Sequence, residues 1–224
     1  MIKNIVRIIV ALIFIASGFV KAIDAVGFSF KLEEYFSPGV FNLPFLEQFA
    51  LPISIFVVAL ELILGVALLL KMDMKRVLKI LITLCVFFGF LTFYSAYYNK
   101  VTDCGCFGDA IKFTPWQSFI KDIVLLIGLI ILWFLYKKDF KNEKSTFKNF
   151  ALLLAVIGSA FIIIKGIITE PIIDFRAYKI GTNLNDEKKK IAENPSEYKV
   201  FYTLKNKTTG ELKEVMQDDY IKIN

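Results

Sequence analysis

Two cysteines separated by one glycine are the residues of this sequence best suited to chemistry. Cys104 and Cys106 stand in the stretch VTDCGCFGD, in a chain of 224 residues with three cysteines and no histidine. A disulfide within a C-x-C pair closes a tight ring, so it departs from relaxed geometry and is easily reduced. Because so small a loop removes little entropy from the unfolded chain, the same disulfide would stabilise a fold only weakly. The pattern favours a redox-active dithiol outside the cytoplasm, where disulfides persist.

Two other interpretations of the pair stay open. A structural disulfide would hold its loop without exchanging electrons. A metal site would offer zinc two thiols and the flanking Asp103 and Asp109, which match its usual ligands poorly. Since histidine is absent from the sequence, we expect neither a metal nor a haem.

The start of a helix lies close to the cysteines in the sequence. The motif TPWQ, which begins eight residues after Cys106, matches a capping box with Thr114 as the N-cap and a proline at the first helical position. The two flanking aspartates disfavour a thiolate, which is the species that attacks a disulfide. If the loop folds back, the positive end of this helix, with Lys112 or Lys121, would favour the thiolate.

The elements that carry these residues are predominantly apolar. Hydrophobic residues make up 56% of the chain and its mean hydropathy is +0.60, which exceeds the apolar content of ordinary soluble domains. Five segments each approach the ~20 residues that a membrane-spanning helix needs. They are residues 5–23, 51–70, 77–98, 117–136 and 149–168. We predict an all-α integral membrane protein in the lipid bilayer, with a four-helix transmembrane bundle, a fifth transmembrane helix and a small polar α/β tail.

The apolar segments divide the chain into three parts. We predict a four-helix membrane domain over residues 1–140, a cytoplasmic linker with the fifth helix over 141–168, and an extracytoplasmic tail over 169–224. In the tail, YKVFYTL and ELKEVM flank a turn at 207–210 and indicate a β-hairpin. Because the tail is small and ends in the strand-like DDYIKIN, we expect it either to belong to a longer domain or to rest on the membrane part.

Lysine and arginine residues indicate the orientation. The N-terminal segment and the connections around 71–79 and 137–148 carry eleven of them, whereas the connections around 21–50 and 99–122 carry five. The positive-inside rule therefore places the N-terminus in the cytoplasm and VTDCGCFGD on the outer side of the membrane. The basic residues flank apolar runs without interleaved aromatic residues, so we expect no nucleic-acid partner. In an alternative, residues 1–24 are a cleaved signal peptide, which leaves the cysteine loop on the same side.

Glu61 is the most unusual charged residue within the predicted spans. It lies near the middle of its span, where a charge costs about 2.5 kcal/mol or more. We expect it to face other helices and to find a partner, and the candidates are Lys21, Tyr94, Tyr97 and Lys121. Two roles stay open, which are a functional contact with a proton or with a cofactor such as a quinone, and a structural hydrogen bond between helices.

The other polar residues of the spans are assigned supporting or structural roles. Lys21 and Asp24, at the outer end of the first span, are interpreted as a charge-paired helix end with a snorkelling lysine. Asp122 lies about two turns into the fourth span, where an unpaired carboxylate is costly, and we expect Lys121 to point elsewhere on that helix. Cys85 is interpreted as a small buried apolar residue.

The segment GFSFKLEEYF, between the first two spans, predicts a short amphipathic helix on the outer surface. Phe28, Leu32 and Tyr35 recur at helical intervals against charged residues. The simplest role of this helix is an interfacial anchor. In the functional alternative, its aromatic face covers a site between the helices.

Several stretches resemble a known group of small membrane proteins. GFVKAID, FKLEEY and ELILG resemble the DoxX family, and DCGCFGDAIKFTPWQSFIKDIVLL resembles its MauE branch. The resemblance covers residues 1–140 and implies a four-helix membrane core, thiol redox reactions and help in forming the disulfides of exported proteins. The DoxX relatives imply a quinone as electron acceptor. The chain departs from helical-bundle thiol oxidases because it has one external cysteine pair and no second pair to relay electrons.

Together these features predict a membrane thiol–disulfide oxidoreductase. Cys104 and Cys106 would exchange electrons with an exported thiol or a thioredoxin-like partner, with a quinone bound near Glu61. The residues expected to support them are Lys21, Asp24, Asp103, Asp109, Lys121 and Asp122. The alternative is a non-catalytic membrane subunit or scaffold with a structural disulfide in its outer loop. A small transporter is a third interpretation, but no repeat or broken helix supports it.

Overall fold

The computed structural model describes residues 2–98, 100–101, 113–137, 140, 145–169, 171–173, 181–193, 201–205 and 212–216. The four predicted site residues Cys104, Cys106, Asp103 and Asp109 lie outside these ranges. The chain divides into two compact units, Met1–Ala177 and Tyr178–Asn224.

Five helices in the described part of the first unit are long and apolar enough to cross a membrane. They are α1 (Ile2–Ile23), α4 (Ala50–Leu69), α5 (Met74–Tyr98), α6 (Pro115–Tyr136) and α7 (Thr146–Ile168). Two short helices, α2 (Ala25–Phe36) and α3 (Pro44–Glu47), lie between α1 and α4. Each predicted span coincides with one of the five long helices, which confirms the all-α integral membrane fold.

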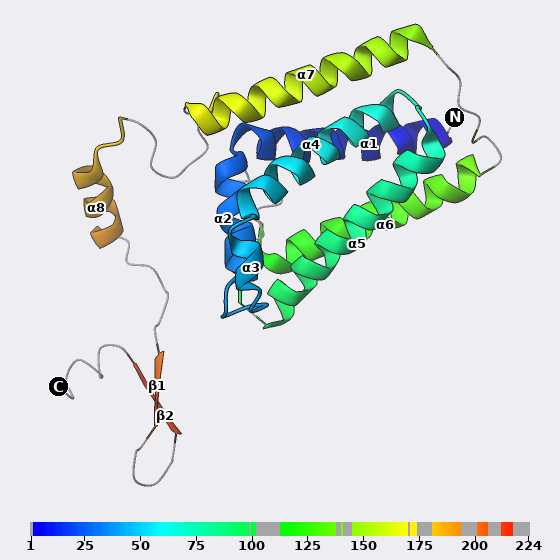
Figure 1. The fold of residues 1–224 in the computed structure, drawn as a ribbon. Coiled ribbons are helices and arrows are strands. Elements are labelled where there is room, and N and C mark those ends of the chain that lie inside the picture. The colour runs from blue at the N-terminus through cyan, green and yellow to red at the C-terminus, as the bar shows by residue number, and fades with distance from the viewer. Residues whose placement is uncertain are drawn as a thin grey trace. The chain divides into compact units, whose positions relative to one another are not determined.

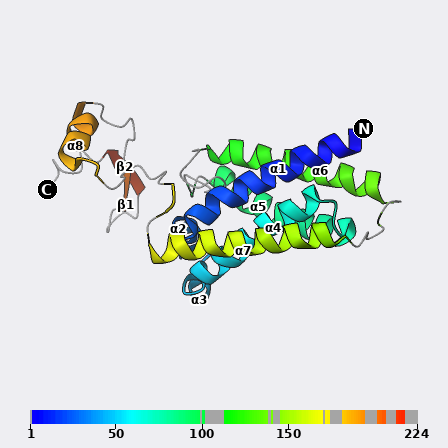
Figure 2. The same ribbon diagram turned by 90° about the horizontal axis from the view of Figure 1, so that it is seen from above.

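The long helices pack in pairs. α1 packs against α4, α5 packs against α6, and α7 lies along α4 and α1 (Figure 2). α2 and α3 lie where α5 ends and α6 begins, and we name this the α2 end of the bundle (Figure 1). The N-terminus and the turn between α4 and α5 lie at the opposite end. Two residues that flank the cysteine-containing connection belong to the α2 end, namely Val101, which packs with Tyr35 of α2, and Phe113, which directly precedes the N-cap of α6.

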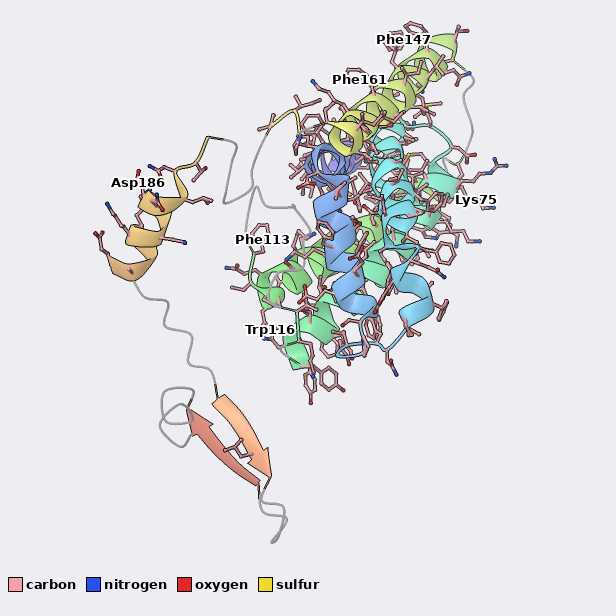
Figure 3. The ribbon with its side chains drawn as sticks, turned by 60° about the vertical axis from the view of Figure 1, so that its left-hand side comes forward. Lys75, Phe113, Trp116, Phe147, Phe161 and Asp186 are labelled. Atoms are coloured by element: carbon pink, nitrogen blue, oxygen red, sulfur yellow. The ribbon has the colours of Figure 1, made fainter. Side chains whose placement is uncertain are left out.

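The outward faces of the long helices are apolar. Phe147 and Phe161 project away from the bundle on α7 (Figure 3), with 74% and 64% of their surface exposed. Facing inward, Leu68, Leu78 and Leu129 from three different helices are fully buried in one core. Apolar surfaces on both the inside and the outside are what a helix bundle needs when its solvent is lipid.

Glycines bring α1 and α4 into close contact. A Cβ atom on Gly18 of α1 would lie 3.0 Å from the backbone nitrogen of Leu62, and one on Gly65 of α4 would lie 3.1 Å from the backbone nitrogen of Ile15. Small residues permit this approach in membrane helices, where close packing rather than the hydrophobic effect holds helices together. The two glycines therefore set the spacing of the helices that carry Lys21 and Glu61.

Replacing Gly18 or Gly65 with alanine is expected to lower the free energy of unfolding by about 1–3 kcal/mol, because the added methyl group meets backbone atoms. Gly158 in α7 is the matched control, since a Cβ atom there meets nothing within 4 Å. Thermal unfolding of the three alanine variants in detergent micelles measures the difference. Equal melting temperatures for all three would contradict the close packing of α1 on α4.

Side chains fix the ends of two of the long helices. Arg7 Nη1 donates hydrogen bonds to the carbonyl oxygens of Leu68, at 2.8 Å, and of Leu69, and so caps the carboxyl end of α4. At the start of α6, Thr114 Oγ1 accepts a hydrogen bond from the Gln117 backbone nitrogen at 3.3 Å. Gln117 Oε1 accepts one from the Thr114 backbone nitrogen at 3.0 Å. These two bonds confirm the predicted capping box, with its proline at the first helical position.

The short helix α2 lies across the end of the bundle. Its Phe28 side chain is 4% exposed and packs in a core cluster with residues of α4. Asp24 caps the helix, since its Oδ1 atom accepts a hydrogen bond from the Gly27 backbone nitrogen at 2.8 Å. Ser54 Oγ of α4 donates to the Ala25 carbonyl oxygen at 2.7 Å. The predicted helix is confirmed, and its apolar face is buried in protein.

The second unit contains α8 (Leu184–Glu193) and an antiparallel pair of strands, β1 (Phe201–Lys205) and β2 (Leu212–Met216). The strands pair from Phe201 opposite Met216 to Lys205 opposite Leu212, which confirms the predicted hairpin. α8 was not predicted, because Leu184 and Ile191 are too few apolar residues to mark a helical face in so polar a sequence. Its available signal is Asn183, whose Oδ1 atom accepts a hydrogen bond from the Asn185 backbone nitrogen at 3.1 Å, as an N-cap does.

Candidate functional site

A buried ion pair joins α1 and α4. Lys21 and Glu61 are 3% and 4% exposed, and Lys21 Nζ contacts Glu61 Oε2. Each residue lies about one helical turn from a close-contact glycine, Gly18 on α1 and Gly65 on α4, so the glycines bring the two charges within reach. Of the four partners predicted for Glu61, the structure selects Lys21.

The predicted role of Lys21 as a snorkelling residue paired with Asp24 is wrong. Residues three apart lie on the same side of a helix, so Lys21 shares with Gly18 the face of α1 that packs on α4. The Asp24 carboxylate caps α2 instead. Lys21 is therefore held inside the bundle by Glu61, because a buried charge in hydrocarbon requires a partner of opposite sign.

Aromatic rings from two further helices surround Lys21. Its Nζ atom lies 5.4 Å from the ring centre of Phe28 on α2 and 4.9 Å from that of Phe88 on α5. At these distances the face of an aromatic ring attracts a cation. Four helices thus meet at one ammonium group, and the geometry favours the interpretation in which α2 covers a site between the helices.

A second buried polar group joins α5 and α6. Asp122 is 3% exposed, its Oδ1 atom lies 2.8 Å from Lys121 Nζ, and its Oδ2 atom accepts a hydrogen bond from Thr92 Oγ1 at 3.1 Å. The Cys85 thiol, buried as predicted, donates to the Asp122 carbonyl oxygen at 3.5 Å. The prediction that Lys121 points elsewhere is wrong, because its long side chain turns back along the helix to its neighbour.

A small cavity of ≈ 10 Å³ connects the two ion pairs. It has room for about one water molecule. We name Lys21, Glu61, Lys121 and Asp122 the charge quartet. Its two cations and two anions balance one another, as a membrane interior of low dielectric requires. The cavity is lined by these four residues together with Phe14, Ser17, Cys85, Phe88 and Leu125.

The quartet has room for a proton or a water molecule and not for a larger ligand. Pockets for small organic molecules measure about 300–1,000 Å³, against ≈ 10 Å³ here. The quinone expected near Glu61 would need a larger space than this cavity, and it stays a prediction. Within the described ranges of the chain, no three His, Cys, Asp or Glu side chains gather in a group that would hold a metal ion.

The predicted dithiol, Cys104 and Cys106, lies outside the described residues, and its flanking residues are held to the bundle. Val101 is fully buried, and its carbonyl oxygen accepts a hydrogen bond from Ser95 Oγ at 2.5 Å. On the other side, Phe113 directly precedes the capped start of α6 (Figure 3). The connection that carries VTDCGCFGD is thus attached at both of its described ends to the α2 end.

Sequence reasoning missed three residues of this site. Ser17 precedes Lys21 by four residues, which puts both on one face of α1, and that spacing is a usable signal. Thr92 is a polar residue within a span, which is also a signal. Phe88 is one of 23 phenylalanines in the chain, so nothing in the sequence distinguishes it from the others.

Comparisons with known proteins show which family and which curated protein this chain is similar to. The family described as "Methylamine utilisation protein MauE" matches residues 1–135, a range that includes α1 to α6 almost to its end, the charge quartet and the C-x-C pair. "Protein TlpB" of Flavobacterium psychrophilum is 34% identical over 165 residues, which represent 70% of this chain and 43% of that protein. The chain therefore spans less than half of the length of this curated relative. No solved structure matches the chain.

Proposed function

This chain belongs to the MauE family, and from that premise we propose that it is a membrane thiol–disulfide redox protein. In the proposal, Cys104 and Cys106 exchange electrons with an exported thiol protein or a thioredoxin-like partner. The match over residues 1–135 confirms the resemblance of the membrane part to MauE, and the wider resemblance to DoxX proteins stays a prediction.

One observation carries the proposal, which is that the only closely spaced thiols of the sequence stand in a connection attached to the bundle on both sides. Val101 is buried before it, and Thr114 caps α6 after it. We propose that this connection presents the two thiols at the membrane surface. The positive end of the α6 dipole then lies on the same side and favours a thiolate.

The proposed exchange needs no co-reactant other than the partner protein, because the partner's disulfide accepts the two electrons. A thiolate of the reduced pair attacks the disulfide of the partner, which forms a mixed disulfide and releases one partner thiolate. The second cysteine attacks the mixed disulfide, so the pair is oxidised and the partner is reduced by two electrons. The same steps in reverse oxidise a dithiol partner. A quinone remains a proposed electron acceptor, and its ring would need a larger space than the cavity beside Glu61.

We also propose that the α2 end faces the periplasm, in a bacterial inner membrane. The opposite end carries the N-terminus and the α4–α5 turn, around which Lys71, Lys75, Arg76 and Lys79 cluster. Basic residues in short connections favour the cytoplasmic side. In this orientation the dithiol and the second unit meet exported proteins rather than cytoplasmic ones.

A redox titration of the full chain in its membrane tests the proposal. Membranes are equilibrated at stepped potentials, denatured and alkylated with a mass tag, so that the oxidised chain carries one tag, on Cys85, and the reduced chain carries three. We expect a midpoint near the about −180 to −210 mV of an oxidising compartment, well above the about −300 mV typical of structural disulfides. A pair that resists strong reductant would contradict the proposal and favour a scaffold with a structural disulfide.

The side of the membrane is tested in the same preparation. After mild reduction, a membrane-impermeant alkylating reagent added to spheroplasts is expected to modify Cys104 and Cys106. Modification only in inverted vesicles would place the pair in the cytoplasm and overturn the proposed orientation. The buried Cys85 provides an internal control, since it is expected to stay unmodified until the protein is denatured.

A further inference from the structure

A groove between α5 and α6 lies apart from the charge quartet, at the end of the bundle opposite the α2 end. Its volume is ≈ 540 Å³. We propose that it binds one anionic phospholipid, with the phosphate at two lysines and an acyl chain along the apolar part. The residues that carry the inference are Lys75, Lys79, Ile82, Ile130, Trp133 and Phe134.

The polar part of the groove is positively charged. Lys75 and Lys79 lie four residues apart, so both project from one face of α5, about 6 Å apart along its axis. Lys75 projects from the start of that helix (Figure 3). The described residues that line the groove include no carboxylate, and the nearby Asp73 is paired with Arg76, Oδ2 to Nε, at 3.3 Å. Two ammonium groups side by side fit a phosphate diester.

The apolar part of the groove continues from the lysines towards the middle of the membrane. Ile82 lies about two turns after Lys75 on α5. On α6, Ile130, Trp133 and Phe134 are spaced three and four residues apart, so they form a facing apolar stripe. Trp133 lies in the last turn of α6, at the depth where tryptophan meets the headgroup region.

The order of these features along the groove identifies the ligand class. Cations at the rim with an apolar channel below them match a lipid that carries its charge at one end, and basic pockets between helices bind such headgroups. A zwitterionic lipid would gain little from two adjacent lysines. A free phosphate would leave the apolar channel unused.

Native mass spectrometry of the purified full chain in mild detergent tests the inference, with phosphatidylglycerol and phosphatidylcholine of identical acyl chains as probes. We expect preferential retention of phosphatidylglycerol. The Lys75→Gln/Lys79→Gln variant is expected to bind it about 30-fold more weakly, from the contribution of each lysine near a lipid surface. Lys188→Gln/Lys189→Gln in α8 removes the same charge elsewhere and is expected to leave binding unchanged.

Two further variants distinguish recognition of the lipid headgroup from binding of the acyl chain. Ile130→Trp fills the apolar channel without changing any charge, so it is expected to abolish retention of the phospholipid, while Lys75→Arg/Lys79→Arg is expected to preserve it. The altered side chains are exposed, and unchanged melting temperatures confirm folding. Equal retention of the two lipids, an unaffected lysine variant, or equally strong binding of glycerophosphate would each overturn the inference. So would a dimer that Ile130→Trp dissociates, because a second chain would then occupy the groove.

Discussion

Replacing Glu61 with leucine is expected to lower the free energy of unfolding by about 3–5 kcal/mol, because the buried Lys21 ammonium loses the carboxylate that contacts it. Lys21 is 3% exposed and cannot reach bulk water without separating α1 from α4. The rings of Phe28 and Phe88 remain near it, but a cation–π contact contributes only about 0.5–2 kcal/mol. Thermal unfolding of the purified chain in mild detergent measures the loss.

The double variant Lys21→Met/Glu61→Leu is the matched control. Replacing both members of a buried ion pair with apolar residues of similar volume is often neutral or stabilising, so most of the lost stability is expected to return. The difference between the stability change of the double variant and the summed changes of the single variants Lys21→Met and Glu61→Leu measures the coupling of the pair. If the losses of the two single variants simply add in the double variant, the ion pair does not link α1 to α4.

The same double variant distinguishes the two roles that the sequence leaves open for Glu61, which are a functional contact with a proton or cofactor and a structural contact between helices. A folded double variant that still exchanges thiols and disulfides would assign the ion pair a structural role. A folded double variant without exchange would show that the charge quartet takes part in the reaction, for instance by holding a proton next to its single-water cavity. Stability and exchange are measured on the same preparation, so a folding defect cannot be mistaken for a functional one.

The features that depend on local sequence were predictable. Each span follows from the length of its apolar run, because the bilayer sets the length that a helix needs. The start of α6 follows from Thr114, Pro115 and Gln117, whose side-chain contacts involve the first helical turn alone. The hairpin follows from two alternating segments around a turn. In each case the physical cause lies within a few residues of the feature.

The errors concern which faces of the helices meet. The sequence shows that Lys21 and Asp24 are close along the chain, but the packing of Gly18 on Leu62 turns Lys21 towards α4. The identity of the partner of Glu61 depends on this packing, so the sequence could name candidates without choosing among them. Lys121 was misplaced because helical geometry fixes the direction of its Cβ atom and not that of its long side chain, which bends back to Asp122.

Replacing either Cys104 or Cys106 with serine is expected to abolish the complete two-step exchange, because each step consumes one of the two thiols. Glutathione disulfide serves as a probe of defined chemistry. The wild-type chain is expected to return to its oxidised form with release of two glutathione molecules, as counted by mass spectrometry. The variant that keeps the attacking cysteine is expected to stop as a mixed disulfide with one bound glutathione, and so to identify that cysteine.

The size of the stability change distinguishes a catalytic pair from a structural one. The loop-closure relation gives only about 1–2 kcal/mol for a disulfide between residues so close together, so both serine variants are expected to stay folded. Thr102→Ser, in the same connection, keeps both thiols and is expected to retain full exchange. The disulfide is structural if two results occur together. Both cysteine variants would lose much more stability than the about 1–2 kcal/mol of the loop-closure relation, and reduced wild-type chains would fail to react with glutathione disulfide. The protein would then act as a scaffold, and the charge quartet would be the remaining candidate for its chemistry.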